Sequence, residues 1–410
     1  MLNNSWHHIS AAPHRSLFLA GALQGIFTLT WWMYDLAGRY AILGTYSVWS
    51  IAPTWAHAFL MIYCFFPFFI FGFLFTTYPN WLNGKKITKH VYMTTCLLMV
   101  TGVALFYTGL IHGQWISVLG VIALLGGFIN AFRALQLVLV KAKEQDRRHA
   151  IATSTALLMG CLGIAAFLLW LLTEIRFLLD FSRYAGIWFF LMPILLTVSH
   201  RMIPFFSSRV LDNYIIVRPY WILWIMLACT VLHGLLQLTH LIQYLWLADF
   251  LLALCALYLS IRWGLLRSFQ VSLLAVLHIA FAWLSVSMLL FGLQSLVFMQ
   301  SETNTWLLGM APLHALAIGY FASMVLGMAS RVTIGHSGRP LVLDRFTWQL
   351  FIGFQATAVV RMLPELIPAI GQLAPILYLF AGLIWLACFT LWAVRYIPVY
   401  WRSRIDGKPG

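Results

Sequence analysis

The chain has 410 residues, of which 62% are hydrophobic and only 9% are charged, a composition that excludes a soluble globular protein. Its formal net charge is +14. The cations gather at the ends of apolar segments, so the charge reflects membrane topology and argues against nucleic acid as a partner. The six cysteines form no CxxC or CxxCH motif, which argues against a zinc ribbon and a covalently attached haem.

Apolar segments fill almost the whole sequence. A helix needs roughly 20 apolar residues to cross a bilayer, which predicts about twelve transmembrane helices here. We therefore expect an all-α integral membrane protein with one polytopic domain over 1–410, including a short N-terminal segment (1–15) and a tail (398–410). The predicted helices lie near 16–36, 54–78, 90–111, 115–140, 149–172, 184–205, 219–241, 243–261, 270–296, 305–330, 346–367 and 373–397.

Lys and Arg concentrate at both termini and in the loops after even-numbered helices, which predicts that both termini are cytoplasmic. In the N-terminal third, His14 and Arg15 precede the first helix on that side. His57 lies near the external end of the 54–78 helix, with Met61 one turn below it. A basic pair at a helix start is commonly an interfacial anchor, and this reading of His14 and Arg15 stays open.

The middle of the chain adds four polar side chains to this pattern. The 184–205 helix carries His200 and Arg201 at its cytoplasmic end, His233 lies in the following helix, and Asp249 is an acid inside the 243–261 segment. Ionisable groups are costly inside a bilayer, so each is a candidate for function.

The 305–330 helix is the segment around which the chain is organised. It carries His314 toward one membrane face and ends in a compact corner with Arg331, His336 and Arg339 at the other. His278 lies inside the preceding helix, toward the cytoplasmic side. The ends of the 54–78, 184–205 and 305–330 helices recur at intervals of about 130 residues, which suggests three units of four helices.

His57 and His314 lie at similar predicted depths on helices that run in the same direction. Two such imidazoles can hold a b-type haem between them. His233 is predicted at a similar depth and is an alternative ligand. The alternative is that each histidine is a neutral polar group that hydrogen-bonds a neighbouring helix.

A second group is predicted on the cytoplasmic side. We expect His336, His200 and His278, with His14 as a fourth member, to approach one another and form a second metal or haem site. Arg331, Arg339 and Arg201 would then be partners of haem propionates or of an anion. The alternative is that these residues cap helices and face the phosphates of membrane lipid.

Taken in order, these motifs resemble the NnrS family. The resemblance is carried by Pro13-His14-Arg15, Trp55-x-His57, His200-Arg201-Met202-Ile203-Pro204, Leu277-His278, His314 to Gly319, and Arg331 to Pro340. It implies a twelve-span protein of the bacterial cytoplasmic (inner) membrane that is associated with haem and copper and with nitric oxide metabolism or resistance.

A more distant similarity is to the catalytic subunit of haem–copper oxidases and nitric oxide reductases. That subunit has twelve helices in three arcs, with low-spin haem ligands on helices 2 and 10, which here carry His57 and His314. Those enzymes have a second histidine two residues further along helix 10, where this chain has Leu316. The only adjacent histidine pair, His7-His8, lies outside the predicted membrane region, so the binuclear centre of those enzymes cannot be built here.

The function expected from the residues and the resemblance together is a redox protein that reduces or detoxifies nitric oxide. We expect haem b and also copper as cofactors, and membrane quinol as electron donor, because no soluble donor domain is recognisable. Two alternatives remain. One is a membrane transporter, in which Asp249 would be the main candidate for ion coupling. The other is a haem-based nitric oxide sensor without turnover.

Overall fold

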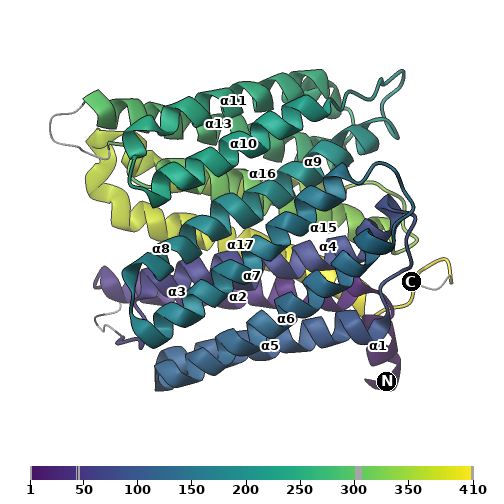
Figure 1. Cartoon of the computed structure of the whole chain (residues 1–410), viewed down its shortest axis with the longest axis horizontal. Coiled ribbons are helices and arrows are strands. Elements are labelled where there is room, and N and C mark those ends of the chain that lie inside the picture. The colour runs from purple at the N-terminus through teal and green to yellow at the C-terminus, as the bar shows by residue number, and fades with distance from the viewer. Residues whose placement is uncertain (1, 43, 45–46, 301–306, 408–410) are drawn as a thin grey trace. The chain divides into compact units, whose positions relative to one another are not determined.

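The computed structural model describes residues 2–42, 44, 47–300 and 307–407, and this part of the chain is helical and contains no strand (Figure 1). The α-helices are α1 (Leu2–Ile9), α2 (Pro13–Arg39), α3 (Pro53–Phe59), α4 (Phe66–Trp81), α5 (Lys89–His112), α6 (Gln114–Lys141), α7 (Arg148–Thr173), α8 (Arg176–Tyr184), α9 (Met192–Ser207), α10 (Tyr220–Leu238), α11 (Leu245–Arg262), α12 (Leu265–Ser268), α13 (Ser272–Gln300), α14 (Ala311–His314), α15 (Ser323–Gly335), α16 (Arg345–Leu366) and α17 (Ala374–Tyr400). Three π-helical segments are η1 (Leu60–Phe65), η2 (Ala185–Leu191) and η4 (Ala315–Ala322), and two 3₁₀ segments are η3 (Ile242–Tyr244) and η5 (Pro368–Leu373).

Eleven helices of the described chain are long and apolar enough to cross a membrane, which confirms the multi-pass all-α fold. They coincide with eleven of the twelve predicted spans. The twelfth, 346–367, is the 22-residue helix α16, whose apolar run is diluted by Gln349, Gln355 and Arg361. The predicted start of the 305–330 span falls partly outside the described residues, and its helix begins at Ala311, where Pro312 suits the first helical turn.

The chain divides into two compact units. The first consists of residues 1–191, 329–340 and 393–410, and the second of residues 192–328 and 341–392. Each unit is therefore built from segments that are far apart in the sequence.

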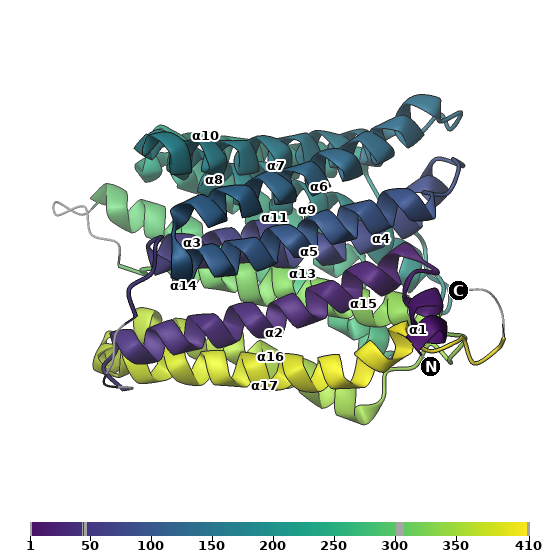
Figure 2. The ribbon, with the colours of Figure 1, turned by 90° about the horizontal axis from the view of Figure 1, so that it is seen from below.

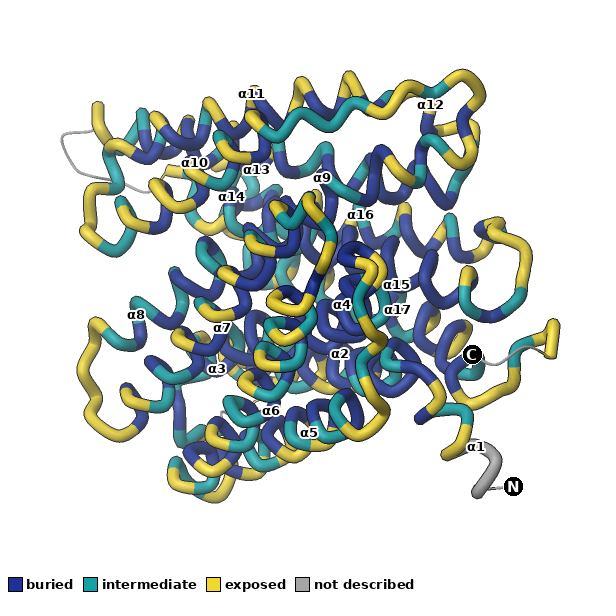
Figure 3. Tube along the Cα trace, turned by 45° about the vertical axis from the view of Figure 1, so that its right-hand side comes forward, coloured by how far each residue is buried: buried dark blue, intermediate teal, exposed yellow. Residues whose placement is uncertain are grey.

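In the first unit, α5 and α6 lie side by side along their length, and α2 packs along α4 (Figures 1 and 2). Helix α4 is apolar on every side because it is rich in phenylalanine, and it is buried along nearly its whole length (Figure 3). Gly72 lets α4 approach α2 closely, since a Cβ there would lie 2.6 Å from the Phe18 ring.

In the second unit, α11 packs along both α10 and α13 (Figure 1). A chain of side-chain hydrogen bonds ties α13, α16 and α15 together. Trp283 Nε1 donates to Gln355 Oε1 over 2.8 Å, and the Gln355 amide donates to Ser323 Oγ over 2.9 Å. Ser323 Oγ in turn donates to the Ile318 carbonyl in η4, over 3.1 Å.

The three π-helical segments lie in the second, sixth and tenth predicted spans. They begin at residues 60, 185 and 315, close to the interval of about 130 residues suggested by the helix ends. Pro67 and Pro193 lie two residues after the ends of η1 and η2. A proline removes one backbone hydrogen bond and crowds the preceding turn, which widens it. π turns are frequent at functional sites, and two of these three segments follow a predicted haem ligand, His57 or His314.

Tyr63 of η1 gives a direct test of this packing. Its hydroxyl donates to the Ser182 carbonyl over 2.6 Å. The same hydroxyl packs against Gly163 and Gly186, where a Cβ would clash with it. We expect Gly163→Ala to lower the free energy of unfolding by about 1–3 kcal/mol through overpacking. The matched control is Gly126→Ala, because a Cβ there would meet only Leu98, at an ordinary 3.8 Å. Thermal unfolding in detergent measures both, and equal midpoints for the two variants would contradict this packing.

Candidate functional site

His57 lies in an aromatic setting at the predicted external end of the first unit. Its imidazole stacks on Trp32 of α2, with ring centroids 4.1 Å apart and an interplanar angle of 12°. The Arg39 guanidinium lies 5.2 Å from the Trp32 ring centroid. Asp35 accepts hydrogen bonds from Arg39 over 2.5 Å and from Trp49 Nε1 over 2.9 Å. This frame fixes the ring of Trp32, and through it the plane of the His57 imidazole.

His314 ends α14 in the second unit, immediately before η4. Its Nδ1 lies 2.9 Å from the Met310 carbonyl. Because a carbonyl can only accept, Nδ1 carries the proton, and the lone pair is on Nε2, the nitrogen suited to bind a metal. His57 belongs to the first unit and His314 to the second, and their pairing across a haem stays a prediction.

His14 and His336 come together at the predicted cytoplasmic end of the first unit. Their ring centroids are 4.8 Å apart, with an interplanar angle of 40°. His14 lies in the first turn of α2 and is only 2% exposed. Its Nδ1 makes no hydrogen bond with any residue that the structure describes. A buried ring nitrogen without a partner is costly, and a bound metal would satisfy it.

The backbone around His336 holds the pair in place. Gly338 adopts a left-handed conformation (φ +76°), and the Ser337 carbonyl accepts a hydrogen bond from Ile405 N over 3.2 Å. One turn before His336, the hydroxyls of Thr333 and Tyr400 lie 3.0 Å apart. The start of α2, the corner after α15 and the C-terminal segment therefore meet at this pair.

Electrostatics keeps the His336 imidazole in the form that binds metals. Burial lowers the pKa of His336 from its ordinary value, and the nearby cations Arg404, Arg15 and Lys86 lower it further. The ring is therefore neutral at pH 7. Ligation of a metal requires neutral imidazoles at about 2.0–2.1 Å, and two rings in contact suit neighbouring positions on one ion.

His200 and His278 are buried in the second unit. His200 Nε2 lies 3.2 Å from the Pro219 carbonyl and therefore donates to it. His278 Nε2 lies 3.1 Å from Ser207 Oγ. The Ser207 hydroxyl already gives its proton to the Ile203 carbonyl, so it accepts from His278. In both rings the proton is thus on Nε2 and the lone pair on Nδ1.

The approach of all four histidines to one another stays a prediction, since His14 and His336 lie in one unit and His200 and His278 in the other. Within either unit, the described residues form no group of three or more His, Cys, Asp and Glu side chains able to hold a metal. The proposed arginine partners are likewise divided, with Arg331 and Arg339 in the first unit and Arg201 in the second. Arg331 is buried, whereas Arg339 is exposed.

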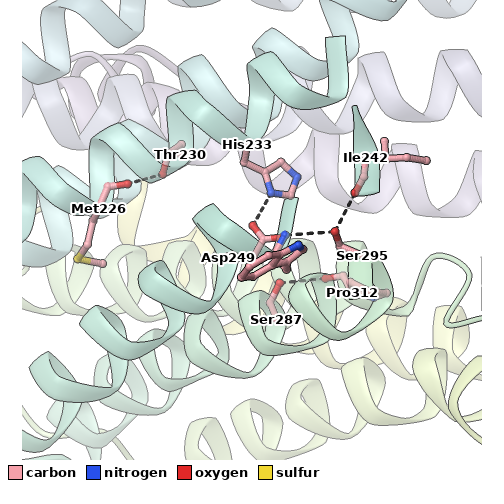
Figure 4. Close-up of polar contacts among 9 residues, drawn as sticks. Met226, Thr230, His233, Ile242, Asp249, Ser287, Ser295 and Pro312 are labelled. Atoms are coloured by element: carbon pink, nitrogen blue, oxygen red, sulfur yellow. Dashed lines mark hydrogen bonds and ion pairs between the residues drawn. The ribbon is translucent and has the colours of Figure 1, made fainter. Parts of the chain in front are cut away.

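Sequence reasoning did not pair His233 with Asp249. In the second unit, His233 Nδ1 of α10 and Asp249 Oδ1 of α11 are 2.5 Å apart, and both side chains are fully buried (Figure 4). Figure 4 shows the carboxylate facing the imidazole. The nearby hydroxyls of Thr230, Ser287 and Ser295 donate to backbone carbonyls instead. The short connection between the two helices was a usable signal, because it places residues near the end of α10 beside residues near the start of α11.

Breaking this pair from one side is expected to destabilise the second unit strongly. Asp249→Leu leaves a buried imidazole without its partner and should cost about 3–5 kcal/mol, whereas the double variant His233→Leu/Asp249→Leu should cost much less. Thermal unfolding of the three proteins measures the difference. A double variant that is as unstable as the single one would show that the pair itself is not the cause.

Comparison with known proteins adds one finding. A family model described as "NnrS protein" matches residues 8–404. No curated protein matches the chain.

Proposed function

The chain belongs to the NnrS family and is a nitric-oxide-related membrane protein, and on this premise we propose that it is a haem- and copper-containing redox protein that reduces nitric oxide. The observation that carries the proposal is the contact between the imidazoles of His14 and His336, at 4.8 Å between ring centroids, with His14 Nδ1 left without a hydrogen bond among the described residues. A buried and a half-buried imidazole in contact, with one unpartnered nitrogen on His14, fit a metal ion better than a helix cap.

The residues divide between two cofactors in this proposal. His57 and His314 are the predicted haem ligands, His14 and His336 hold copper, and His200 and His278 stay further candidates for a metal. A bound metal supplies a centre that binds nitric oxide and takes up electrons. Arg331 offers a buried cation for an anion at the cytoplasmic end, and Trp32 fixes the plane of the His57 ring.

The overall reaction is balanced by membrane quinol. One quinol releases two electrons and two protons and becomes quinone, and two molecules of nitric oxide take them up and become nitrous oxide and water. Nitric oxide is small and uncharged, so it reaches a buried site through the apolar bilayer. Nitric oxide therefore does not require an aqueous channel through the helices.

A second candidate rests on His233 and Asp249. A fully buried His–Asp pair within membrane-spanning helices is typical of proton and ion pathways in transporters. A proton- or cation-coupled carrier is therefore the alternative function, and a haem-based sensor is a third.

Anaerobic consumption of nitric oxide by the reconstituted protein separates these functions. With a quinol analogue, we expect nitrous oxide to form at half the rate of nitric oxide loss. Haem-loaded protein that binds nitric oxide without turnover would favour a sensor. Protein without haem that moves a cation or proton across liposomes would favour the carrier.

A further inference from the structure

Four polar side-chain atoms are buried at the meeting point of α2, η1 and α5 in the first unit. They are Gln24 Nε2, Thr28 Oγ1, Trp31 Nε1 and Tyr107 OH, and none makes a well-formed hydrogen bond with a residue that the structure describes. We call this set the Tyr107 cluster. It belongs to neither of the two proposed metal sites.

The cluster is one continuous surface. Gln24, Thr28 and Trp31 follow one another at the i, i+4 and i+7 positions of α2, so they lie along one face of the helix. Tyr107 of α5 faces them: its hydroxyl lies within hydrogen-bonding reach of the Thr28 and Gln24 side chains, although in poor geometry, and Cys64 of η1 is nearby. Gln24 is 4% exposed, and Thr28 and Cys64 are fully buried.

Such a cluster is unfavourable unless something polar binds to it. Each buried donor or acceptor without a partner costs about 1–3 kcal/mol, and native proteins satisfy nearly all of them. The atoms comprise an amide N–H, an indole N–H and two hydroxyls. The set contains no charged side chain, so it suits an uncharged ligand with oxygen atoms that accept hydrogen bonds.

The depth of the cluster limits the ligand further. Gln24 lies eleven residues beyond Pro13, the first residue of α2. At a rise of about 1.5 Å per residue this is roughly 16 Å, about half the thickness of the hydrocarbon core. Only a lipid-soluble molecule reaches this level. Leu23 and Phe27 of α2 and Ile111 of α5 have exposed side chains, whereas the four atoms of the cluster are buried.

From this arrangement we infer that the Tyr107 cluster binds the head group of a membrane quinol. A quinol ring carries two oxygen atoms on opposite sides, which suits donors one to two helical turns apart on α2 together with a hydroxyl on α5. The inference rests on the proposed function for its role. Thr28 lies one turn from Trp32, which stacks on His57, so a quinol here is next to the predicted haem ligand.

The test measures binding of decylubiquinone to the purified full-length protein by quenching of tryptophan fluorescence. Thr28→Val and Tyr107→Phe each remove one hydroxyl and keep the shape, and each should weaken binding by about five- to tenfold. The matched controls are Thr30→Val and Tyr258→Phe, whose side chains are exposed. Both controls should bind decylubiquinone like the unaltered protein.

Two results would overturn the inference. One is unchanged affinity in Thr28→Val and Tyr107→Phe, or no binding at all. The other is a pair of variants with lower thermal midpoints but equal quinone affinity, which would show that the cluster holds ordered water only.

Nitric oxide consumption driven by ascorbate and phenazine methosulfate separates this inference from the proposed function. Nitric oxide consumption with that donor but no quinone binding would contradict the quinol site and still support nitric oxide reduction as the function. Quinone binding that depends on Thr28 and Tyr107, without consumption from either donor, would end the function and leave the site standing.

Discussion

Alanine in place of His14 or His336 is expected to lower the tightly bound copper of the purified protein by more than about tenfold. Loss of an outer partner of a metal ligand already costs about 10–100-fold in affinity, and loss of a ligand costs at least that much. The two rings are in contact and come from opposite ends of the chain. Either variant should therefore have nearly the same effect, because each leaves the other imidazole alone. Elemental analysis by mass spectrometry measures the copper.

The control for this prediction is His90→Ala, since His90 is exposed at the start of α5, on the same predicted side of the membrane. It should retain all of its copper. Added imidazole should restore binding to the His336→Ala protein, whose site is only half-buried, and this separates a lost ligand from a misfolded chain. Full copper and haem in both His14→Ala and His336→Ala would show that the pair is a packing contact.

His57→Ala and His314→Ala are each expected to abolish the low-spin haem spectrum, with haem content reduced by more than about tenfold. The reason is that both imidazoles would hold the haem in this proposal, and the low-spin spectrum would need both of them. The Met310 carbonyl accepts the Nδ1 proton of His314, so the lone pair is on Nε2, the nitrogen that would bind iron. A pyridine haemochrome assay and the optical spectrum of the purified protein measure the outcome.

His112→Ala is the matched control, since His112 is exposed at the predicted external end of α5. Its spectrum should not change. If His57→Ala and His233→Ala lose the spectrum while His314→Ala keeps it, His233 is the second ligand. An unchanged low-spin spectrum in both His57→Ala and His314→Ala would exclude the pairing.

The π turns connect the sequence pattern with these predictions. The recurring helix ends suggested that the second, sixth and tenth spans are equivalent, and each of these spans contains a π-helical segment. A proline after η1 and η2 explains the wide turn locally, whereas η4 has none. There Gly319 lies against the Trp283 ring, where a Cβ would be 2.5 Å from a ring carbon, and Ser323 donates to the Ile318 carbonyl.

The sequence by itself determined the fold class, the approximate spans and the side chains worth weighing. Long apolar segments are stable in a bilayer, and ionisable groups there are costly. Both effects depend on residues close together in the sequence, so they can be recognised without the tertiary structure. This is why eleven predicted spans coincide with the membrane-spanning helices, and why His14, His57, His314 and His336 stand out from the amino-acid sequence alone.

Only the tertiary structure decided which of these side chains meet. The contact of His14 with His336, the pairing of His233 with Asp249 and the Tyr107 cluster each join different helices. Many rotations of a helix about its axis keep its apolar face in lipid or in the core. The hydropathy of a helix therefore does not determine which side chains of neighbouring helices it contacts. The choice comes from close packing, in which glycines such as Gly72 and Gly163 admit one large ring or hydroxyl and thereby fix the rotation and depth of each helix.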